Sequence, residues 1–244
     1  IPFDIENDVS YMYAVHLHLF YIDLAEEFVH YFKNLPHGYD LYITVVDESI
    51  IQNVFKIFEN CGANKIEMVV VDNVGRDVAP MLFDLKEKLY DSKYKIIGHF
   101  HSKKSISTDN QLGNKWRKYL LDNLIGDKED SKSILSLFND NAVGLVFAED
   151  RHYMDMGENK EYFDSLCNKM GIKTIDETPV FPLGNMFWAR TESIKQLFTL
   201  NKTDVIQPEP LPYDGSYMHA LERITSHLVN ENQFKYITVY KNGT

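Results

Sequence analysis

The stretch DLYITVVDESIIQNVFKIFENCGANKIEMVVVD, residues 40–72, decides the fold. Residues 40–47 are rich in β-branched and aromatic side chains, which is typical of a strand. Residues 48–62 carry apolar side chains at helical spacing and close on Gly62, a residue type that often ends helices. Residues 65–72 then form a second apolar strand. This strand–helix–strand order predicts parallel strands joined through a helix.

The same alternation extends along the first half of the chain. We predict strands at 13–21 and 94–101, and helices at 23–35 and 79–90. The strands are short and largely apolar, which favours a mainly parallel central sheet flanked by helices on both faces. In open α/β sheets of this kind, ligands bind at the carboxyl ends of the strands.

The second half is less regular, but it continues the same mixture of helices and strands. It shows no repeat and no low-complexity linker, so we predict a single α/β domain over residues 1–244 with halves at 1–105 and 106–244. The predicted elements are helices at 114–126, 130–140, 157–171, 191–200 and 215–229, strands at 142–150, 181–190 and 234–241, and a Pro-rich loop at 207–215.

Composition excludes several classes of protein. The 25 Lys and Arg against 36 Asp and Glu give a net charge of −11, which argues against nucleic-acid binding. No stretch approaches the roughly 18 apolar residues of a membrane-spanning helix. Cys61 and Cys167 lack metal-type spacing, so a reducing cytoplasmic setting is the default. The chain starts at Ile1 without Met, and we expect a domain excised from a longer protein.

Basic residues gather around the predicted fourth strand, against the acidic trend of the chain. A lysine run is usually a solvated face, but this one follows a strand at the predicted ligand edge. Ammonium groups there would form charge-assisted hydrogen bonds with a phosphate, so we interpret the run as a phosphate-binding site. Asp109 opposes it, and its members are Lys93, Lys95, Lys103, Lys104, Lys115, Arg117 and Lys118.

Histidines mark the ends of two predicted strands. His99 and His101 are two residues apart, so they face the same side of their strand, and so do His16 and His18. His99 and His101 could contact phosphate, receive hydrogen bonds or bind a metal, but a catalytic metal site needs a further ligand. His16 and His18 could be structural histidines whose hydrogen bonds are satisfied on a half-polar face of the sheet. Alternatively, they could lie beside the base or the sugar of a bound nucleotide.

The turn NVGRDVAP, residues 73–80, carries the next group of candidates. Gly75 permits a tight turn, and Asp77 and Pro80 suit the start of a helix. A turn followed by a capped helix accounts for Gly75, Asp77 and Pro80, but it does not account for Arg76. An arginine at this edge can pair with a phosphate or hold Asp77 in place.

A later segment, PYDGSYMHALER at 212–223, combines acidic and basic side chains at a loop–helix junction. Asp214 could cap the helix or act as a general base. His219 and Glu222 are three residues apart and share one helix face. In PLGNMFWAR, residues 182–190, Trp188 could stack on a sugar ring or fill the core.

Taken in order, these segments resemble a known family. NVGRDVAP, GHFHSKKS, WRKYLL, GNMFWAR and DGSYMHALER closely resemble the rhamnan synthesis protein F family, bacterial glycosyltransferase domains that build rhamnose-containing and related surface polysaccharides. The resemblance covers about residues 11–225. More broadly, Asn73, Gly75 and Arg76 resemble the Asn-x-Gly turn of GT-A glycosyltransferases. The chain departs from them where His99-Phe100-His101 replaces Asp-x-Asp.

The resemblance implies a single GT-A-like (Rossmann-like) domain that transfers rhamnose or a related sugar with inversion. Its first half would bind the nucleotide sugar and its second half the acceptor, with Asp214 as the base. The implied donor-binding residues are Asn73, Gly75, Arg76, Asp77, His99, His101, Lys103 and Lys104. The implied acceptor or pocket residues are Trp188, His219, Glu222 and Arg223.

Donor, acceptor and location follow from the same resemblance. The donor would be dTDP-rhamnose or another nucleotide sugar, the acceptor a glycan or a lipid-linked molecule, and the location the cytoplasm, either free or at the inner face of the membrane. One rival form uses Mn²⁺ or Mg²⁺ held by His99 and His101. Another is a non-catalytic carbohydrate-binding or assembly module of a larger synthase. An oxidoreductase is disfavoured because no G-x-G-x-x-G follows the first strand.

Overall fold

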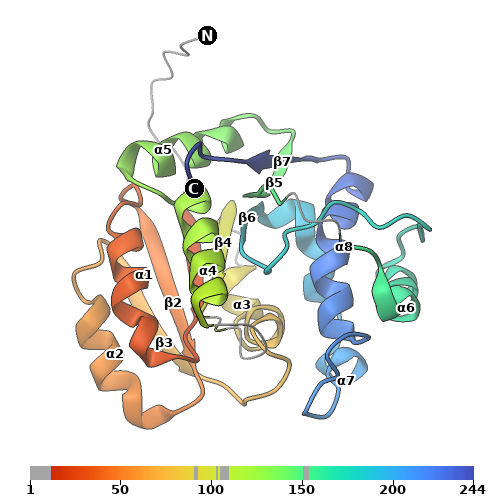
Figure 1. Cartoon of the computed structure of the whole chain (residues 1–244), viewed down its shortest axis with the longest axis horizontal. Helices are drawn as coiled ribbons and strands as arrows, with labels where there is room; N and C mark the ends of the chain where they lie inside the picture. The colour runs from red at the N-terminus through yellow and green to blue at the C-terminus, as the bar shows by residue number, and fades with distance from the viewer. Residues whose placement is uncertain (1–11, 91–92, 103, 105–109, 151–153) are drawn as a thin grey trace.

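A twisted sheet forms the centre of the computed structural model, which describes residues 12–90, 93–102, 104, 110–150 and 154–244 (Figure 1). Within these residues the sheet has seven strands in the order β3-β2-β1-β4-β6-β5-β7. Neighbours are parallel except around β6, which runs antiparallel to β4 and β5. The strands are β1 Tyr13–His18, β2 Tyr39–Val45, β3 Lys65–Val70, β4 Ile96–His101, β5 Val143–Ala148, β6 Phe187–Arg190 and β7 Lys235–Val239.

Helices and shorter helical turns, the latter labelled η, connect the strands and cover both faces. The first half contains η1 Ile22–Leu24, α1 Ala25–Phe32, η2 Glu48–Ile50, α2 Ile51–Phe58, η3 Pro80–Asp84 and α3 Lys86–Leu89. The second half contains α4 Asn110–Leu124, α5 Lys128–Ser136, η4 Leu137–Asn139, η5 Gly157–Asn159, α6 Lys160–Met170, η6 Thr191–Thr199, α7 Lys202–Val205 and α8 Tyr217–Glu231.

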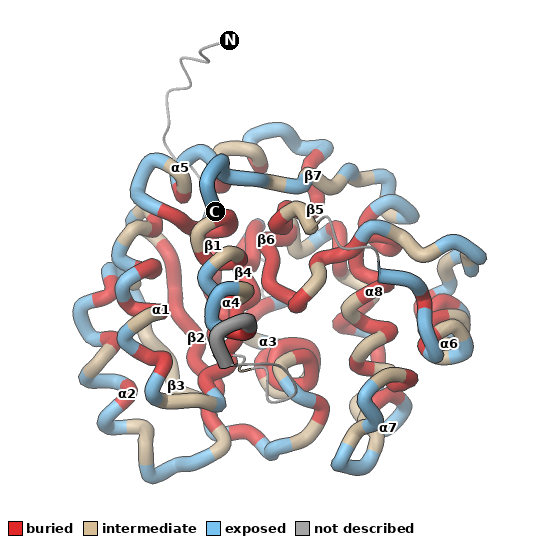
Figure 2. The backbone as a smooth tube through the Cα atoms, viewed as in Figure 1, coloured by how far each residue is buried: buried red, intermediate tan, exposed pale blue. Residues whose placement is uncertain are grey.

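Each face of the sheet has its own hydrophobic core, and the inner strands β1, β2, β4 and β5 are buried along their whole length, whereas the edge strands β3 and β7 are partly exposed (Figure 2). Because side chains alternate along a strand, Val15 of β1 packs into one core and Ala14 into the other. The first core includes α1, α2, α4 and α5, and the second includes η3, α6, η6 and α8. A fully buried side chain such as Phe32 contributes about 1.5–3 kcal/mol by leaving water.

The mainly parallel sheet predicted from the sequence is confirmed, with four local corrections. The helix predicted at 79–90 is divided into a π turn, η3, and a short α3, because Leu85 leaves the helical conformation. The strand predicted at 181–190 shrinks to β6, because left-handed residues precede it. Residues 191–199 form a 3-10 helix, and α7 lies in a stretch where no helix was predicted.

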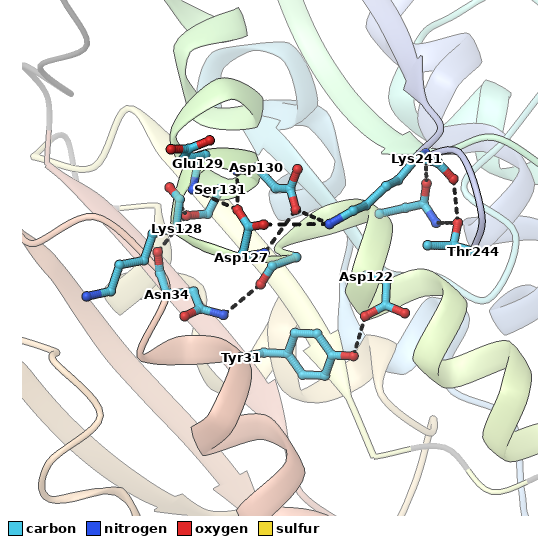
Figure 3. Close-up of polar contacts among 12 residues, drawn as sticks. Tyr31, Asn34, Asp122, Asp127, Lys128, Glu129, Asp130, Ser131, Lys241 and Thr244 are labelled. Atoms are coloured by element: carbon cyan, nitrogen blue, oxygen red, sulfur yellow. Dashed lines mark hydrogen bonds and ion pairs between the residues drawn. The ribbon is translucent and has the colours of Figure 1, made fainter.

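The segment after β7, residues 240–244, packs over α4 and α5 (Figure 3). Lys241 Nζ lies 2.5 Å from Asp130 Oδ2 and 3.8 Å from Asp127 Oδ2. The Lys241 amide donates to Asn123 Oδ1 at 2.6 Å. Asp127 also caps α5, because its carboxylate accepts hydrogen bonds from the first backbone amides of that helix. These contacts hold the segment against the helices that cover the first core.

Candidate functional site

Polar side chains replace apolar ones toward the carboxyl ends of β1, β2 and β4. They lie on the face of the second core, where His16 and His18 follow Ala14 along β1. The parallel register places His16 opposite His99 and His18 opposite His101. Neighbouring strands in register bring such side chains into contact, and all four histidines are buried.

These side chains form one continuous chain of hydrogen bonds that ends on Asp77. Thr44 Oγ1 lies 2.9 Å from both His18 Nδ1 and His16 Nε2. His16 Nδ1 lies 3.0 Å from His99 Nδ1, and His99 Nε2 lies 3.2 Å from Asp77 Oδ2. If His99 carries one proton, on Nε2, every donor in the chain points toward Asp77. If His99 also carries a proton on Nδ1, it donates to His16, and the hydrogen bonds that link His16, Thr44 and His18 all reverse.

Burial and neighbouring charge set the protonation of the chain. Burial lowers the pKa of His18 to about 4. Burial, and then the nearby imidazole of His99, lowers the pKa of His16 well below its usual value. Burial alone would raise the pKa of Asp77, but the imidazoles of His101 and His99 outweigh it and hold that pKa well below its usual range. At neutral pH the site therefore contains an ionised carboxylate and neutral His16 and His18.

The turn that carries Asp77 adopts a left-handed backbone. Gly75 has φ 69° and Arg76 has φ 55°, an uncommon conformation for an arginine. A side chain at position 75 would collide with Ala79 and Ile206, so glycine is required there. Strained backbone of this kind concentrates at functional sites. The turn presents Arg76 outward, where its guanidinium lies 2.8 Å from His219 Nε2 and 3.4 Å from the Pro212 carbonyl.

A second left-handed turn, Gly184 (φ 85°) and Asn185 (φ 52°), meets the first. His101 Nε2 donates to the Gly184 carbonyl at 2.7 Å, and the Gly184 amide donates to Glu222 Oε1 at 2.6 Å. Asn185 Nδ2 donates to Asp77 Oδ2 at 2.6 Å. Sequence reasoning missed Asn185 as a site residue, although a Gly-Asn pair is a recognisable signal for this conformation.

Asp214 holds two loops together. Its Oδ2 accepts from the Glu158 amide at 3.0 Å, and its Oδ1 accepts from Asn159 Nδ2 at 2.6 Å. Burial opposes these bonds, but they prevail and lower the pKa of Asp214. Asn159 in turn accepts from the Ser216 amide at 3.2 Å, and the cap of α8 is Ser216.

This network reaches the Arg76 turn. Ser216 Oγ lies 2.8 Å from His219 Nδ1, so Asp214 is connected through Asn159, Ser216 and His219 to Arg76.

Two residues expected to line an acceptor pocket are buried. Trp188 is completely buried between Tyr13 and Phe100, and its Nε1 donates to the Leu124 carbonyl at 2.8 Å. It is a core residue, so the role expected for it is corrected. Arg223 is also buried; its guanidinium bonds the His219 carbonyl and the Asp155 carbonyl and covers the Phe181 ring.

The basic run does not form one cluster in the described part of the chain. Lys93 pairs with Asp40 at the amino end of β2, on the edge away from Asp77. Lys104 is at the carboxyl edge, where it pairs with Asp23 and lies 4.9 Å from the centre of the Tyr21 ring.

Two further members of the run, both on α4, also pair with acidic side chains. Arg117 pairs with Glu27 at 2.8 Å, and Lys118 lies 3.9 Å from Asp122. Asn73 is an exposed residue in the turn after β3. Lys103 lies outside the described residues.

The histidines do not fit a metal site. Both ring nitrogens of His99 are hydrogen-bonded within the protein, and His101 Nε2 donates to a carbonyl, so a metal ion would have to displace these partners. Among the described residues, no three His, Cys, Asp or Glu side chains are arranged to hold a metal ion.

Comparison with known proteins identifies the family. The model of the family described as "Rhamnan synthesis protein F" matches residues 5–234. The chain belongs to this family. Two relatives, both named "Uncharacterized protein WxcX" and from two strains of Xanthomonas campestris pv. campestris, are 28% identical over 231 residues. The match covers 93% of this chain and 32% of each relative, so the chain spans about a third of their length.

A solved cytidylyltransferase from Leptospira borgpetersenii is similar at a TM-score of 0.42 and 10% identity, over 96% of this chain and 78% of that one. As for membranes, none of the helices in the described ranges is both long and apolar enough to cross a bilayer.

Proposed function

We propose that the chain is a glycosyltransferase domain of GT-A type, which transfers rhamnose or a related sugar from a nucleotide diphosphate to a growing surface polysaccharide. Membership in the rhamnan synthesis protein F family supports a role in polysaccharide synthesis that uses nucleotide sugars. The observation that carries the proposal is the carboxyl edge of the sheet, where an exposed Arg76 stands beside the ionised Asp77.

In this proposal Arg76 binds the donor diphosphate. Its contacts with His219 and the Pro212 carbonyl orient the guanidinium while the residue stays exposed. An oriented guanidinium stabilises the charge that develops on a leaving nucleoside diphosphate. Gly75 and Asn73 shape the turn, and Lys104 adds positive charge at the same edge. Lys103, which the sequence also predicts to bind the donor, lies outside the described residues.

Asp214 is the proposed base for the acceptor hydroxyl, with His219 and Glu222 near the acceptor. Because both Asp214 oxygens accept hydrogen bonds, its replacement could also loosen the loops. Asp214→Asn keeps the shape and one acceptor oxygen. We expect this variant to bind donor but lose transfer. A variant with near-normal turnover would exclude Asp214 as the base.

The rival function is a non-catalytic carbohydrate-binding or assembly module. The observation that favours it is the engagement of both Asp214 oxygens in holding loops. Thermal unfolding with a panel of nucleotide sugars, including dTDP-rhamnose, distinguishes the two because a bound ligand raises Tm. A glycosyltransferase is stabilised by one of these donors, whereas the rival is stabilised by glycan alone. Repeating the panel with EDTA tests the form that depends on Mn²⁺ or Mg²⁺.

A further inference from the structure

Two oxygen atoms at the centre of the site accept no hydrogen bond from the described residues. Asp77 Oδ2 receives Asn185 Nδ2 at 2.6 Å and His99 Nε2 at 3.2 Å, but no described group donates to Oδ1. Among the described residues, any side-chain oxygen of Asp77 or Asn185 that is fully buried has a hydrogen-bond partner. Asp77 Oδ1 and Asn185 Oδ1 have no such partner, so they are not fully buried and solvent reaches them.

The structure fixes the orientation of both groups. The Asn185 amide must turn its NH₂ toward the ionised Asp77, which leaves its oxygen directed elsewhere. The Asn185 backbone is left-handed, and its neighbour Gly184 is bonded on both sides by His101 and Glu222. Behind Asp77, His99 and the buried chain hold the carboxylate in place. A rigid pair of acceptors needs little ordering when a ligand binds.

The chemistry of the pair defines its ligand. Carboxylate and amide oxygens accept hydrogen bonds, so the ligand must donate, and a phosphate is repelled by the ionised Asp77. The neighbouring Arg76 has the opposite preference. A molecule that carries hydroxyl groups beside a diphosphate satisfies both residues at once.

We propose that Asp77 Oδ1 and Asn185 Oδ1 together bind vicinal hydroxyl groups of a sugar ring in the donor, with Asn185 as a binding residue. This inference rests on the proposed function. The ring is either the transferred sugar or, where the donor is a ribonucleotide, its ribose; the 2′-deoxyribose of a dTDP-sugar has no vicinal hydroxyl pair. The two share the same chemistry.

A glycine substitution tests the pair without straining the fold. Asn185→Gly removes the amide, while glycine adopts the observed positive φ more readily than asparagine. Gln233→Gly is the matched control, because Gln233 also has a positive φ (64°) and lies away from the site, after the end of α8. Both variants should fold, which thermal unfolding verifies.

The probes are UDP, 2′-deoxy-UDP and L-rhamnose, titrated into each protein by NMR. We expect Asn185→Gly to weaken the binding of a hydroxyl-bearing probe about tenfold or more, and Gln233→Gly to leave that affinity unchanged. Loss of the preference for UDP over 2′-deoxy-UDP assigns the pair to the ribose. Loss of L-rhamnose binding assigns it to the transferred sugar.

The two proposals fail in different ways. Unchanged binding of every probe by Asn185→Gly, or no binding of any probe by the wild type, overturns the hydroxyl pair. Nucleotide-sugar turnover that persists in Asn185→Gly with unchanged KM also overturns the pair and leaves the enzyme standing. A wild type that binds L-rhamnose through Asn185 but consumes no nucleotide sugar refutes the enzyme alone.

Discussion

Two largely buried carboxylates lie at opposite edges of the same sheet, and they are held in different ways. Asp40, at the amino end of β2, accepts from the Tyr94 hydroxyl at 2.5 Å and from Lys93 Nζ at 3.3 Å. Asp77, at the carboxyl edge, is held by an amide and by imidazoles. Asp40 thus meets an amine and a phenol, whereas Asp77 meets an amide and two imidazoles and adjoins the exposed Arg76. The first arrangement suits structure and the second suits a ligand.

The largest contrast is expected from the matched variants Asp77→Asn and Asp40→Asn. Asp77→Asn removes the charge beside Arg76 and should lower kcat/KM for transfer about 100-fold, the scale of a lost preorganised contact. Asp40→Asn should retain kcat/KM but lower the free energy of unfolding by about 1–3 kcal/mol, because it weakens a buried charged hydrogen bond. Kinetics and urea denaturation on both proteins check this. Equal loss of turnover in the two variants would erase the distinction between the edges.

The sequence predicted the alternation of strands and helices because local periodicity carries that information. It also located the carboxyl edge, since strand order in an α/β pattern places His99 and Arg76 there. It could not show that His16 and His99 pair, because this depends on the register between strands that are distant in sequence. Trp188 shows the same limit: a buried indole and a sugar-stacking indole look alike in sequence.

Acid should destabilise the carboxyl edge. The folded protein lowers the pKa of His18 to about 4, whereas an unfolded histidine titrates near 6.5. Between these values the unfolded chain binds the proton that the folded chain excludes, so the free energy of unfolding falls as pH drops from about 6.5 to about 4. The lowered pKa of Asp77 has its effect at more acidic pH, because the stability that the ionised carboxylate contributes is lost only as the pH falls below about 4.

The test of this pH dependence is His18→Gln, which keeps a polar group near Thr44. This variant should reduce the acid-induced fall in the free energy of unfolding between pH about 6.5 and about 4 by about 1–3 kcal/mol, measured by urea denaturation at several pH values. His30 lies exposed on α1, so His30→Gln is the control. A slope that is identical in wild type and His18→Gln would contradict neutral burial of this ring.

The smallest effect sharpens the account of the buried chain itself. Thr44→Val keeps the shape of the side chain but removes the hydroxyl between His16 and His18, at a stability cost of about 1 kcal/mol. Thr225→Val removes another buried hydroxyl, which bonds the Leu221 carbonyl within α8, and serves as the control.

The specific readout is the ¹⁵N tautomer of each histidine. In the wild type we expect His16 and His18 to carry their protons on Nδ1, the pattern in which the chain points toward Asp77. In Thr44→Val, His16 and His18 should no longer be held in one tautomer each, whereas Thr225→Val should leave both tautomers unchanged. Protons on Nε2 of His16 and His18 in the wild type would show the reversed direction instead.

The most direct test of the central claim is release of nucleoside diphosphate from a panel of nucleotide sugars with a glycan acceptor, by the wild type and Arg76→Ala. The account predicts turnover of at least one donor by the wild type and a loss of about 100-fold in the variant. No turnover of any donor, or equal turnover by the two proteins, would contradict a donor site at the carboxyl edge.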